Sequence, residues 1–191
     1  MIRLRSASSP AWVAAVRGDL DGLLGDHAAC ERQAAMNALA LVAGYRTRPA
    51  LVDALILLAE EELKHYREVH AELVRRGKTL PEPRSNTYAV ELAKLVRKGD
   101  DETKLVDRLL VAAVIEARSC ERLQVLGEAL EAPLGPFYAE LARSEARHHG
   151  IYVRLARTET TGVDVDARLA ELLDAEAALL ARLPVHAVVH A

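Results

Sequence analysis

The sequence has few aromatic residues and no long apolar run, and its first residues do not look like a signal peptide. Aromatic side chains make up 4% of its 191 residues, and the apolar positions are mostly Ala, Leu and Val without clusters of β-branched residues, which favours helices over strands. No stretch approaches the roughly 20 apolar residues that span a membrane, and Met1 to Trp12 contains no apolar core of a signal peptide. We therefore expect an all-α protein that is soluble and cytoplasmic and has no membrane partner.

Cysteine is also scarce, and neither acidic nor basic residues are in large excess. The two cysteines, Cys30 and Cys120, have neither the spacing of a metal site nor the partners of a disulfide framework, so we interpret them as small core residues. The formal net charge of −3 argues against a strongly basic nucleic-acid binder, and we expect no DNA partner. If four of the 28 acidic residues bind metal, the remaining balance is 25 − 24 = +1, so charge neither indicates nor excludes binding to RNA.

Helical periodicity, capping residues and helix breakers predict helices in one domain that spans residues 1–191. Four of these helices are long enough to form a bundle, and the others are short or peripheral. The connection after the second long helix is unusually long, which allows a crossover that sets the second and third long helices parallel. The predicted helices are Pro10–Arg17, Asp19–Gly44, Pro49 to the residue before Gly77, Tyr88–Lys98, Thr103–Leu126, Pro136–Ala156 and Asp164–Arg182.

Two Glu-x-x-His motifs lie in inward-facing apolar stripes of the second and fourth long helices, and a lone glutamate precedes each motif by about thirty residues, in the stripe of the helix before it. Residues three apart share one face of a helix, so each motif offers a carboxylate and an imidazole to one ion while the lone glutamates bridge from neighbouring helices. This arrangement is the dinuclear carboxylate site of ferritin-like bundles. The predicted metal ligands are Glu31, Glu62, His65, Glu116, Glu145 and His148.

Depth along the helices distinguishes two candidates on the third long helix. In an antiparallel helix pair, residues equally far from the turn meet, because each residue rises about 1.5 Å along the axis. The glutamates of the first two long helices are matched in this way, and Glu116 and Glu145 are nearly matched about their own loop. Glu121 would lie about five residues nearer that loop, a mismatch of roughly 7 Å. We therefore assign Glu116 as the ligand and give Glu121 a supporting or ion-pairing role, with Arg122 as a candidate partner.

A single Glu-x-x-His pair or one inward histidine often has no metal role, since a lone buried histidine is usually a hydrogen-bonded core residue. Four glutamates in apolar stripes are different, because an unpaired carboxylate in an apolar interior costs several kcal/mol or takes up a proton. Carboxylate-rich ligation with two imidazoles suits iron or manganese rather than structural zinc. His27, one turn before Glu31, is a candidate to support that ligand. The other histidines are expected at the surface: His70, His149, His186 and His190.

Four segments resemble the tRNA methylthio-isopentenyladenosine hydroxylase family, and the resemblance covers roughly Leu20 to Arg157. The third segment is the most specific, because Glu-x-x-His pairs are common to ferritin-like proteins whereas its Glu-Ala-Arg-Ser-Cys-Glu-Arg run is not required by metal binding. All six predicted ligands match the ligand positions of that family. The segments are Asp-His-Ala-Ala-Cys-Glu-Arg (Asp26–Arg32), Glu-Glu-Leu-Lys-His (Glu61–His65), Arg-Leu-Leu-Val-Ala-Ala-Val-Ile-Glu-Ala-Arg-Ser-Cys-Glu-Arg (Arg108–Arg122) and Arg-Ser-Glu-Ala-Arg-His (Arg143–His148).

The resemblance implies a ferritin-like four-helix bundle with two iron ions, and O2-dependent hydroxylation of the isopentenyl chain on a modified adenosine beside the tRNA anticodon. It also implies a tRNA partner, an external electron donor and no catalytic side chain beyond the metal ligands. Hydroxylating an unactivated C–H bond needs an oxidant that no side chain provides, which agrees with metal chemistry. Two rivals stay open: an iron-oxidising or iron-storing protein of the ferritin or rubrerythrin type, and a helical bundle without metal.

A tRNA substrate requires cations near the site, because phosphate contacts dominate such affinity. Three basic clusters at helix ends or on the crossover are candidates. An ordinary solvated surface explains each of them at least as well, since no aromatic-rich RNA-binding motif accompanies them. The clusters are Arg46 with Arg48, then Arg75, Arg76 and Lys78, and finally Lys94, Arg97 and Lys98.

Overall fold

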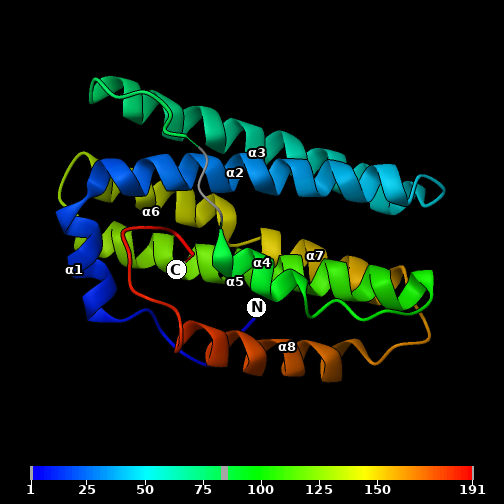
Figure 1. Cartoon of the computed structure of the whole chain (residues 1–191). Helices are drawn as coiled ribbons and strands as arrows, with labels where there is room; N and C mark the ends of the chain where they lie inside the picture. The colour runs from blue at the N-terminus through cyan, green and yellow to red at the C-terminus, as the bar shows by residue number, and fades with distance from the viewer. Residues whose placement is uncertain (1, 83–85, 191) are drawn as a thin grey trace. The chain divides into compact units, whose positions relative to one another are not determined.

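The computed structural model describes residues 2–82 and 86–190, and within them the chain forms helices joined by turns, without a strand (Figure 1). This confirms the predicted all-α class. None of the helices in the described part is both long and apolar enough to cross a membrane. Of the predicted crossover, Pro83 and the two residues after it lie outside the described residues.

Contacts divide the chain into two compact units. The first boundary between the two units along the chain falls between Ala14 and Ala15, inside helix α1 (Pro10–Gly18). The prediction of a single domain over the whole chain stays a prediction. The hairpin unit comprises Ala15–Ser85 and Ala187–Val189, and the larger unit comprises Met1–Ala14, Asn86–His186 and His190–Ala191.

The hairpin unit is built on two long helices, α2 (Leu20–Gly44) and α3 (Pro49–Arg75), that lie side by side (Figure 1). Asp19 caps α2, because its Oδ1 accepts a hydrogen bond from the backbone N of Gly22 at 2.9 Å. Pro49 occupies the first turn of α3, where its missing N–H has no cost. Buried apolar side chains recur every three or four residues along both helices: Leu24, Ala28, Ala35, Leu41, Leu51, Leu55, Leu58, Val69 and Leu73.

Residues 78–82 cross α2 at a glycine. A Cβ on Gly25 would lie 2.6 Å from Cγ of Pro81, so only glycine lets this segment pass so close to the helix. One residue further along α2, the carboxylate of Asp26 accepts a hydrogen bond from the backbone N of Val189 at 2.7 Å. The first half of α2 thus anchors two segments of the hairpin unit that are far apart in the sequence.

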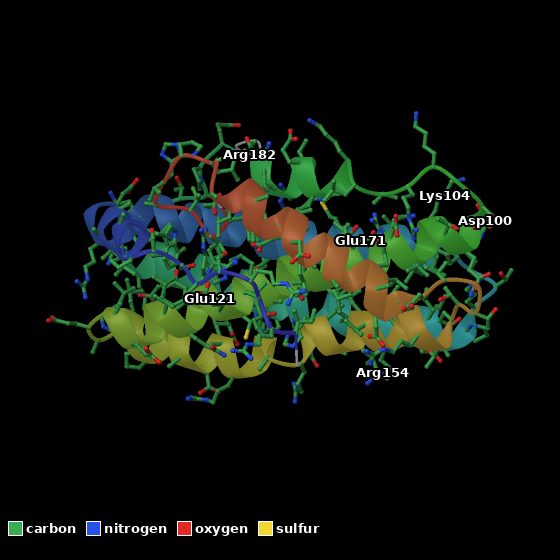
Figure 2. The ribbon with its side chains drawn as sticks, turned by 90° about the horizontal axis from the view of Figure 1, so that it is seen from below. Asp100, Lys104, Glu121, Arg154, Glu171 and Arg182 are labelled. Atoms are coloured by element: carbon green, nitrogen blue, oxygen red, sulfur yellow. The ribbon has the colours of Figure 1, made fainter. Side chains whose placement is uncertain are left out.

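In the larger unit, α5 (Asp101–Ala129) is the central helix, and the other long helices of the unit pack against it (Figure 1). Apolar residues are buried on most of its circumference. Asp100, labelled at its start in Figure 2, caps α5 by accepting a hydrogen bond from the backbone N of Thr103 at 2.7 Å. The helices around it are α4 (Thr87–Ala93), α6 (Leu134–Glu145), α7 (His148–Thr158) and α8 (Val165–Leu180).

Helix α4 is shorter than the predicted Tyr88–Lys98, because the chain after Ala93 turns toward α5. There the buried carboxylate of Asp107 accepts hydrogen bonds from the backbone N (2.8 Å), Nε (2.9 Å) and Nη2 (2.8 Å) of Arg97. Arg168 of α8 donates to the same carboxylate from Nε at 2.9 Å and Nη2 at 3.0 Å. Burial alone would raise the pKa of Asp107, but the hydrogen bonds from both arginines lower it below its usual range.

A second buried network joins α5 to α4 and α8. Arg118 donates to the two carboxylate oxygens of Glu176 at 2.8 and 3.1 Å, and the hydroxyl of Tyr88 donates to the same carboxylate at 3.1 Å. Burial alone would lower the pKa of Arg118, but the hydrogen bond to Glu176 raises it. These buried charges are tolerated because each one has an opposite charge and hydrogen bonds.

The prediction of one continuous helix over Pro136–Ala156 is wrong. Helix α6 ends at Glu145 and α7 starts at His148. The two residues between them keep right-handed helical dihedral angles, so the helix is interrupted in its hydrogen bonds without a change of hand. The residues that open α7, two histidines and a glycine, have low helix propensity, which explains why the interruption falls here.

Asp107→Asn tests the first network, because it removes one charge and leaves both arginines. We expect the free energy of unfolding at neutral pH to fall by about 2–4 kcal/mol. Since the pKa of Asp107 is lowered in the folded protein, its contribution is complete above the ordinary pKa of aspartate and is lost as the pH falls through the lowered value. Urea denaturation between neutral pH and about pH 3 should show that the free energies of unfolding of the wild type and of Asp107→Asn approach each other in acid. A difference that stays constant would contradict this account.

Gly135 and Gly150 form a matched pair for stability measurements. A Cβ on Gly135 would lie 2.1 Å from the backbone O of Leu130, so Gly135→Ala must displace the turn before α6 and should cost about 2 kcal/mol or more. A Cβ on Gly150 would meet no atom within 4 Å, so Gly150→Ala should stabilise α7 by about 0.5–1 kcal/mol. Thermal denaturation of both variants measures the two effects. A Gly135→Ala protein as stable as the wild type would refute the close contact.

Candidate metal centre

The hairpin unit brings together Glu31 of α2 with Glu62 and His65 of α3. Nδ1 of His65 lies 3.9 Å from Oε2 of Glu31 and 3.9 Å from Oε2 of Glu62, as equal distances from the turn predict. The three residues are 6%, 1% and 1% exposed, respectively. The three side chains therefore share one buried place, and their role as metal ligands stays a prediction.

His27 adds a second imidazole to this group. It is buried one helical turn before Glu31, and its Nε2 lies 2.5 Å from Oε1 of that glutamate. The two carboxylate oxygens of Glu31 therefore face different imidazoles, Oε1 toward His27 and Oε2 toward His65. A close contact of this kind orients the carboxylate of Glu31, and the role of His27 in supporting a metal ligand stays a prediction.

The larger unit holds Glu116 of α5, Glu145 at the end of α6 and His148 at the start of α7. Nδ1 of His148 lies 2.6 Å from Oε2 of Glu145, and the three residues are 6%, 2% and 0% exposed, respectively. The interruption between α6 and α7 falls inside this Glu-x-x-His motif. The two side chains still meet, because the intervening residues keep helical dihedral angles.

Cys120 lies on α5, one turn after Glu116. Burial and then the negative charges of Glu145 and Glu116 raise the pKa of Cys120 to about 11. The thiol is therefore protonated at neutral pH and behaves as a small core residue.

Glu121, the candidate that depth along the helix rejected, is engaged elsewhere in the larger unit (Figure 2). Its carboxylate accepts hydrogen bonds from the backbone N of Ser8 at 2.8 Å, from Oγ of Ser8 at 2.7 Å and from Nη1 of Arg118 at 3.0 Å. Arg122 donates to Oγ of Ser8 at 3.1 Å. Glu121 thus ties the N-terminal segment to α5, which is consistent with the choice of Glu116 as the ligand.

Two histidines that the sequence placed at the surface are buried. His149 directly follows the ligand candidate of α7, and burial lowers its pKa. His190 stacks on the ring of Tyr88 with a centroid distance of 5.3 Å, and its Nε2 lies 2.6 Å from Oγ of Ser119. The expectation was wrong because His149 sits at the helix interruption and His190 in a C-terminal segment without helical periodicity, where the spacing of apolar residues gives no indication of burial.

Several of the predicted phosphate-binding cations form ion pairs within the protein. Such pairs reduce the positive charge that these clusters present to RNA. The pairs are Arg75–Glu72, Arg76–Asp21, Lys78–Asp21, Lys94–Glu91 and Arg97–Asp107.

A cavity of about 410 Å³ opens in the hairpin unit beside residues 78–82. Ala29 and Arg32 of α2 and Tyr66 of α3 line it. These residues neighbour Glu31 and His65 in the sequence but lie on other faces of their helices. The cavity is therefore separate from the space between the predicted ligands.

The two units carry the same set of donor atoms, two carboxylates and one imidazole each. Carboxylate oxygens with imidazole nitrogens suit iron and manganese, whereas a structural zinc site favours thiolates. Burial of two carboxylates in one place is costly unless a cation balances them. Each set therefore fits one divalent metal ion by its chemistry and its burial.

The chain matches a family model over residues 2–191, and that model is described as tRNA-(MS2IO6A)-hydroxylase (MiaE). Two curated relatives carry the name tRNA 2-(methylsulfanyl)-N(6)-isopentenyladenosine(37) hydroxylase. The relative from Pseudomonas putida is 44% identical over 165 residues, which are 86% of this chain and 80% of that protein. The relative from Salmonella typhimurium is 38% identical over 130 residues, which are 68% of this chain and 47% of that protein, so the match spans about half of its length.

A solved structure, Protein 43 with aldehyde deformylating oxygenase activity from Synechococcus, matches this chain with a TM-score of 0.93 at 36% identity, covering 100% of this chain and 96% of that chain. This likeness confirms the predicted ferritin-like fold. The family resemblance of the four segments is confirmed by the family model and the curated relatives. The chain therefore belongs to the tRNA-(MS2IO6A)-hydroxylase (MiaE) family.

Proposed function

We propose that this protein hydroxylates the isopentenyl side chain of a (methylthio-)isopentenyladenosine next to the anticodon of tRNA, using O2. Membership of the family and the name shared by the two curated relatives support this substrate and reaction. The observation in this chain that carries the proposal is the repeated donor set, two buried carboxylates with an imidazole in each unit. A C–H hydroxylation requires a metal or organic cofactor, and these donors suit a metal.

The proposed cofactor is two iron ions, for which the donor sets of the two units supply the ligands. The four negative charges of the carboxylates match the four positive charges of two ferrous ions, so the metal-loaded site has no net charge. Without metal, each donor set would bury uncompensated negative charge. Iron supplies the reduction of O2 and the oxidising power that a C–H bond requires. The proposed ligands are Glu31, Glu62 and His65 from the hairpin unit and Glu116, Glu145 and His148 from the larger unit.

The protein's own residues hold and shield this centre. All six donor side chains are nearly inaccessible to solvent, which keeps water away and strengthens electrostatic interactions. His27 orients Glu31 through the contact between its Nε2 and Oε1 at 2.5 Å. Insertion of one oxygen atom of O2 into a C–H bond, with reduction of the other to water, consumes two electrons and two protons. We therefore include an external electron donor and a cytoplasmic location, where tRNA is found, in the proposal.

Aldehyde deformylation is a second candidate, because a protein named for that activity is 36% identical to this chain with a TM-score of 0.93. The tRNA reaction has the stronger support, since the family model describes a tRNA hydroxylase and a relative of that name is 44% identical. Iron storage has no such support among these relatives. Release of formate from a long-chain aldehyde by the iron-loaded protein, without action on tRNA, would favour the second candidate.

Glu116→Gln and Glu121→Gln form a matched pair on α5 for testing the ligands. The amide keeps the shape of the side chain and removes its charge. We expect Glu116→Gln to lose about half or more of the iron bound by the wild type, because a ligating carboxylate is lost. Glu121→Gln should keep its iron and lower the melting temperature, because its contacts with Ser8 and Arg118 weaken. Anaerobic titration with ferrous iron measures the first effect. Equal iron content in Glu116→Gln and the wild type would overturn the assignment.

The modified nucleosides of tRNA test the reaction. In cells that make the prenylated nucleoside but lack a hydroxylase for it, the wild-type gene should add one oxygen atom to that nucleoside, detected by mass spectrometry. The Glu62→Gln gene should not, because a proposed ligand is missing. Glu61→Gln, the adjacent glutamate outside the donor set, is the matched control and should act as the wild type does. An iron-loaded wild-type protein that leaves the nucleoside unchanged would refute tRNA hydroxylation and leave the metal centre intact.

A further inference from the structure

Four arginines form one row along the exposed face of α6 and α7. They follow one another at spacings of four, seven and three residues, which place residues on one side of a helix. The interruption does not break the row, because the residues between α6 and α7 keep helical dihedral angles. The arginine stripe consists of Arg143, Arg147, Arg154 and Arg157, all of them exposed.

The stripe is a positive face on a chain whose formal net charge is −3. Helices α6 and α7 contain two glutamates, and only Glu140 is exposed, since Glu145 is buried. The exposed residues of these helices and of the interruption between them therefore carry four positive charges and one negative charge. This imbalance differs from the cluster of Arg75, Arg76 and Lys78, whose cations pair with neighbouring carboxylates.

Two arginines of the stripe have ion-pair partners that compete only weakly for an anion. Arg143 pairs with Glu140, and Arg157 pairs with Asp166, with all four side chains more than half exposed. Ion pairs of this kind contribute at most about 1 kcal/mol. Arg154 forms no ion pair with any described residue, and in Figure 2 its side chain extends from α7.

The stripe passes directly over the proposed ligands of the larger unit. Arg147 is exposed, and it stands between Glu145 and His148, which are buried. One turn of the chain therefore presents a cation outward and two proposed ligands inward. The turn that carries Arg46, by contrast, is 15 residues from Glu31, or roughly 22 Å along α2.

We propose that the arginine stripe binds the phosphate backbone of the tRNA substrate, an inference that rests on the proposed function. From Arg143 to Arg157 the stripe extends about 21 Å, which is enough for several consecutive phosphates of one strand. A guanidinium offers two parallel N–H groups to a phosphate. Gly150 lies in the same row, and a Cβ there would meet no atom within 4 Å, so the backbone is accessible to RNA in the middle of the stripe.

Two triple variants test the proposal in the iron-loaded protein. Arg147 stays unchanged in both, because it stands between two proposed ligands. The stripe variant carries Arg143→Gln, Arg154→Gln and Arg157→Gln. The control variant removes the same charge from other exposed positions, one of them labelled in Figure 2, and carries Arg17→Gln, Arg67→Gln and Arg182→Gln.

Fluorescence anisotropy with prenylated tRNA gives the dissociation constants. At about 0.1 M salt we expect the stripe variant to bind roughly 30-fold more weakly, and the slope of log affinity against log salt to fall by about two to three. The control variant should change affinity by less than about threefold. Iron content and hydroxylation of the free modified nucleoside should equal those of the wild type in both variants, because neither depends on phosphate contacts.

The outcomes separate this proposal from the proposed function. Wild-type tRNA affinity in the stripe variant, or an equal loss in the control variant, would overturn the stripe as the docking surface while wild-type hydroxylation of tRNA continues. Failure of the wild-type protein to hydroxylate tRNA would remove the proposed function itself. Wild-type tRNA affinity together with slower reduction of the iron by an acidic ferredoxin would assign the stripe to the electron donor instead.

A single substitution serves if the triple variant does not fold, as judged by circular dichroism. Arg154→Glu reverses the charge of the arginine without an ion pair to a described residue, and we expect affinity for tRNA to fall about tenfold. Arg154→Lys keeps the charge and should stay within about threefold of the wild type. Unchanged affinity in Arg154→Glu would overturn the proposal.

Discussion

Burial of carboxylates in the middle of apolar helices is the constraint on which the rest of this structure depends. Glu31 and Glu62 lie in the same stripes as leucines and alanines, and a charged group in such a place is costly unless a cation balances it. The helices that hold these groups must gain their stability elsewhere. In the hairpin unit that stability comes from the apolar residues before and after the glutamates along both helices, and from segments that α2 anchors at Gly25 and Asp26.

The larger unit contains two kinds of buried acid, and their neighbours distinguish them. Asp107 and Glu176 receive hydrogen bonds from arginine side chains, so their charges are balanced within the protein and hold helices together. Glu145 lies against an imidazole, His148, which is a metal-binding group when neutral. Arginine partners therefore identify structural acids, whereas histidine partners identify acids that are available to a metal ion. Glu121, which is partly exposed, also has an arginine partner, Arg118.

A long-range arrangement can be predicted from the sequence where it follows from local periodicity. In a helical hairpin with a short turn, counting residues from the turn fixes which side chains meet, and Glu31, Glu62 and His65 do meet. Periodicity does not reveal the structure where a weak local preference competes with packing. The interruption after Glu145 arises from residues of low helix propensity inside a stripe that reads as one helix. The burial of His190 depends on a stacking partner, Tyr88, about a hundred residues away in the sequence, which no periodicity reveals.

The same Glu-x-x-His motif thus occurs in two different settings. On α3 it lies within a continuous helix of 27 residues, where every backbone group near the ligands is part of the helical hydrogen-bond pattern. Between α6 and α7 it spans an interruption, so the chain around Glu145 and His148 is less constrained by helical hydrogen bonds. One of the two residues at that interruption, Arg147, is exposed and belongs to the arginine stripe. The less constrained copy of the motif is therefore the one whose chain also presents positive charge to solvent.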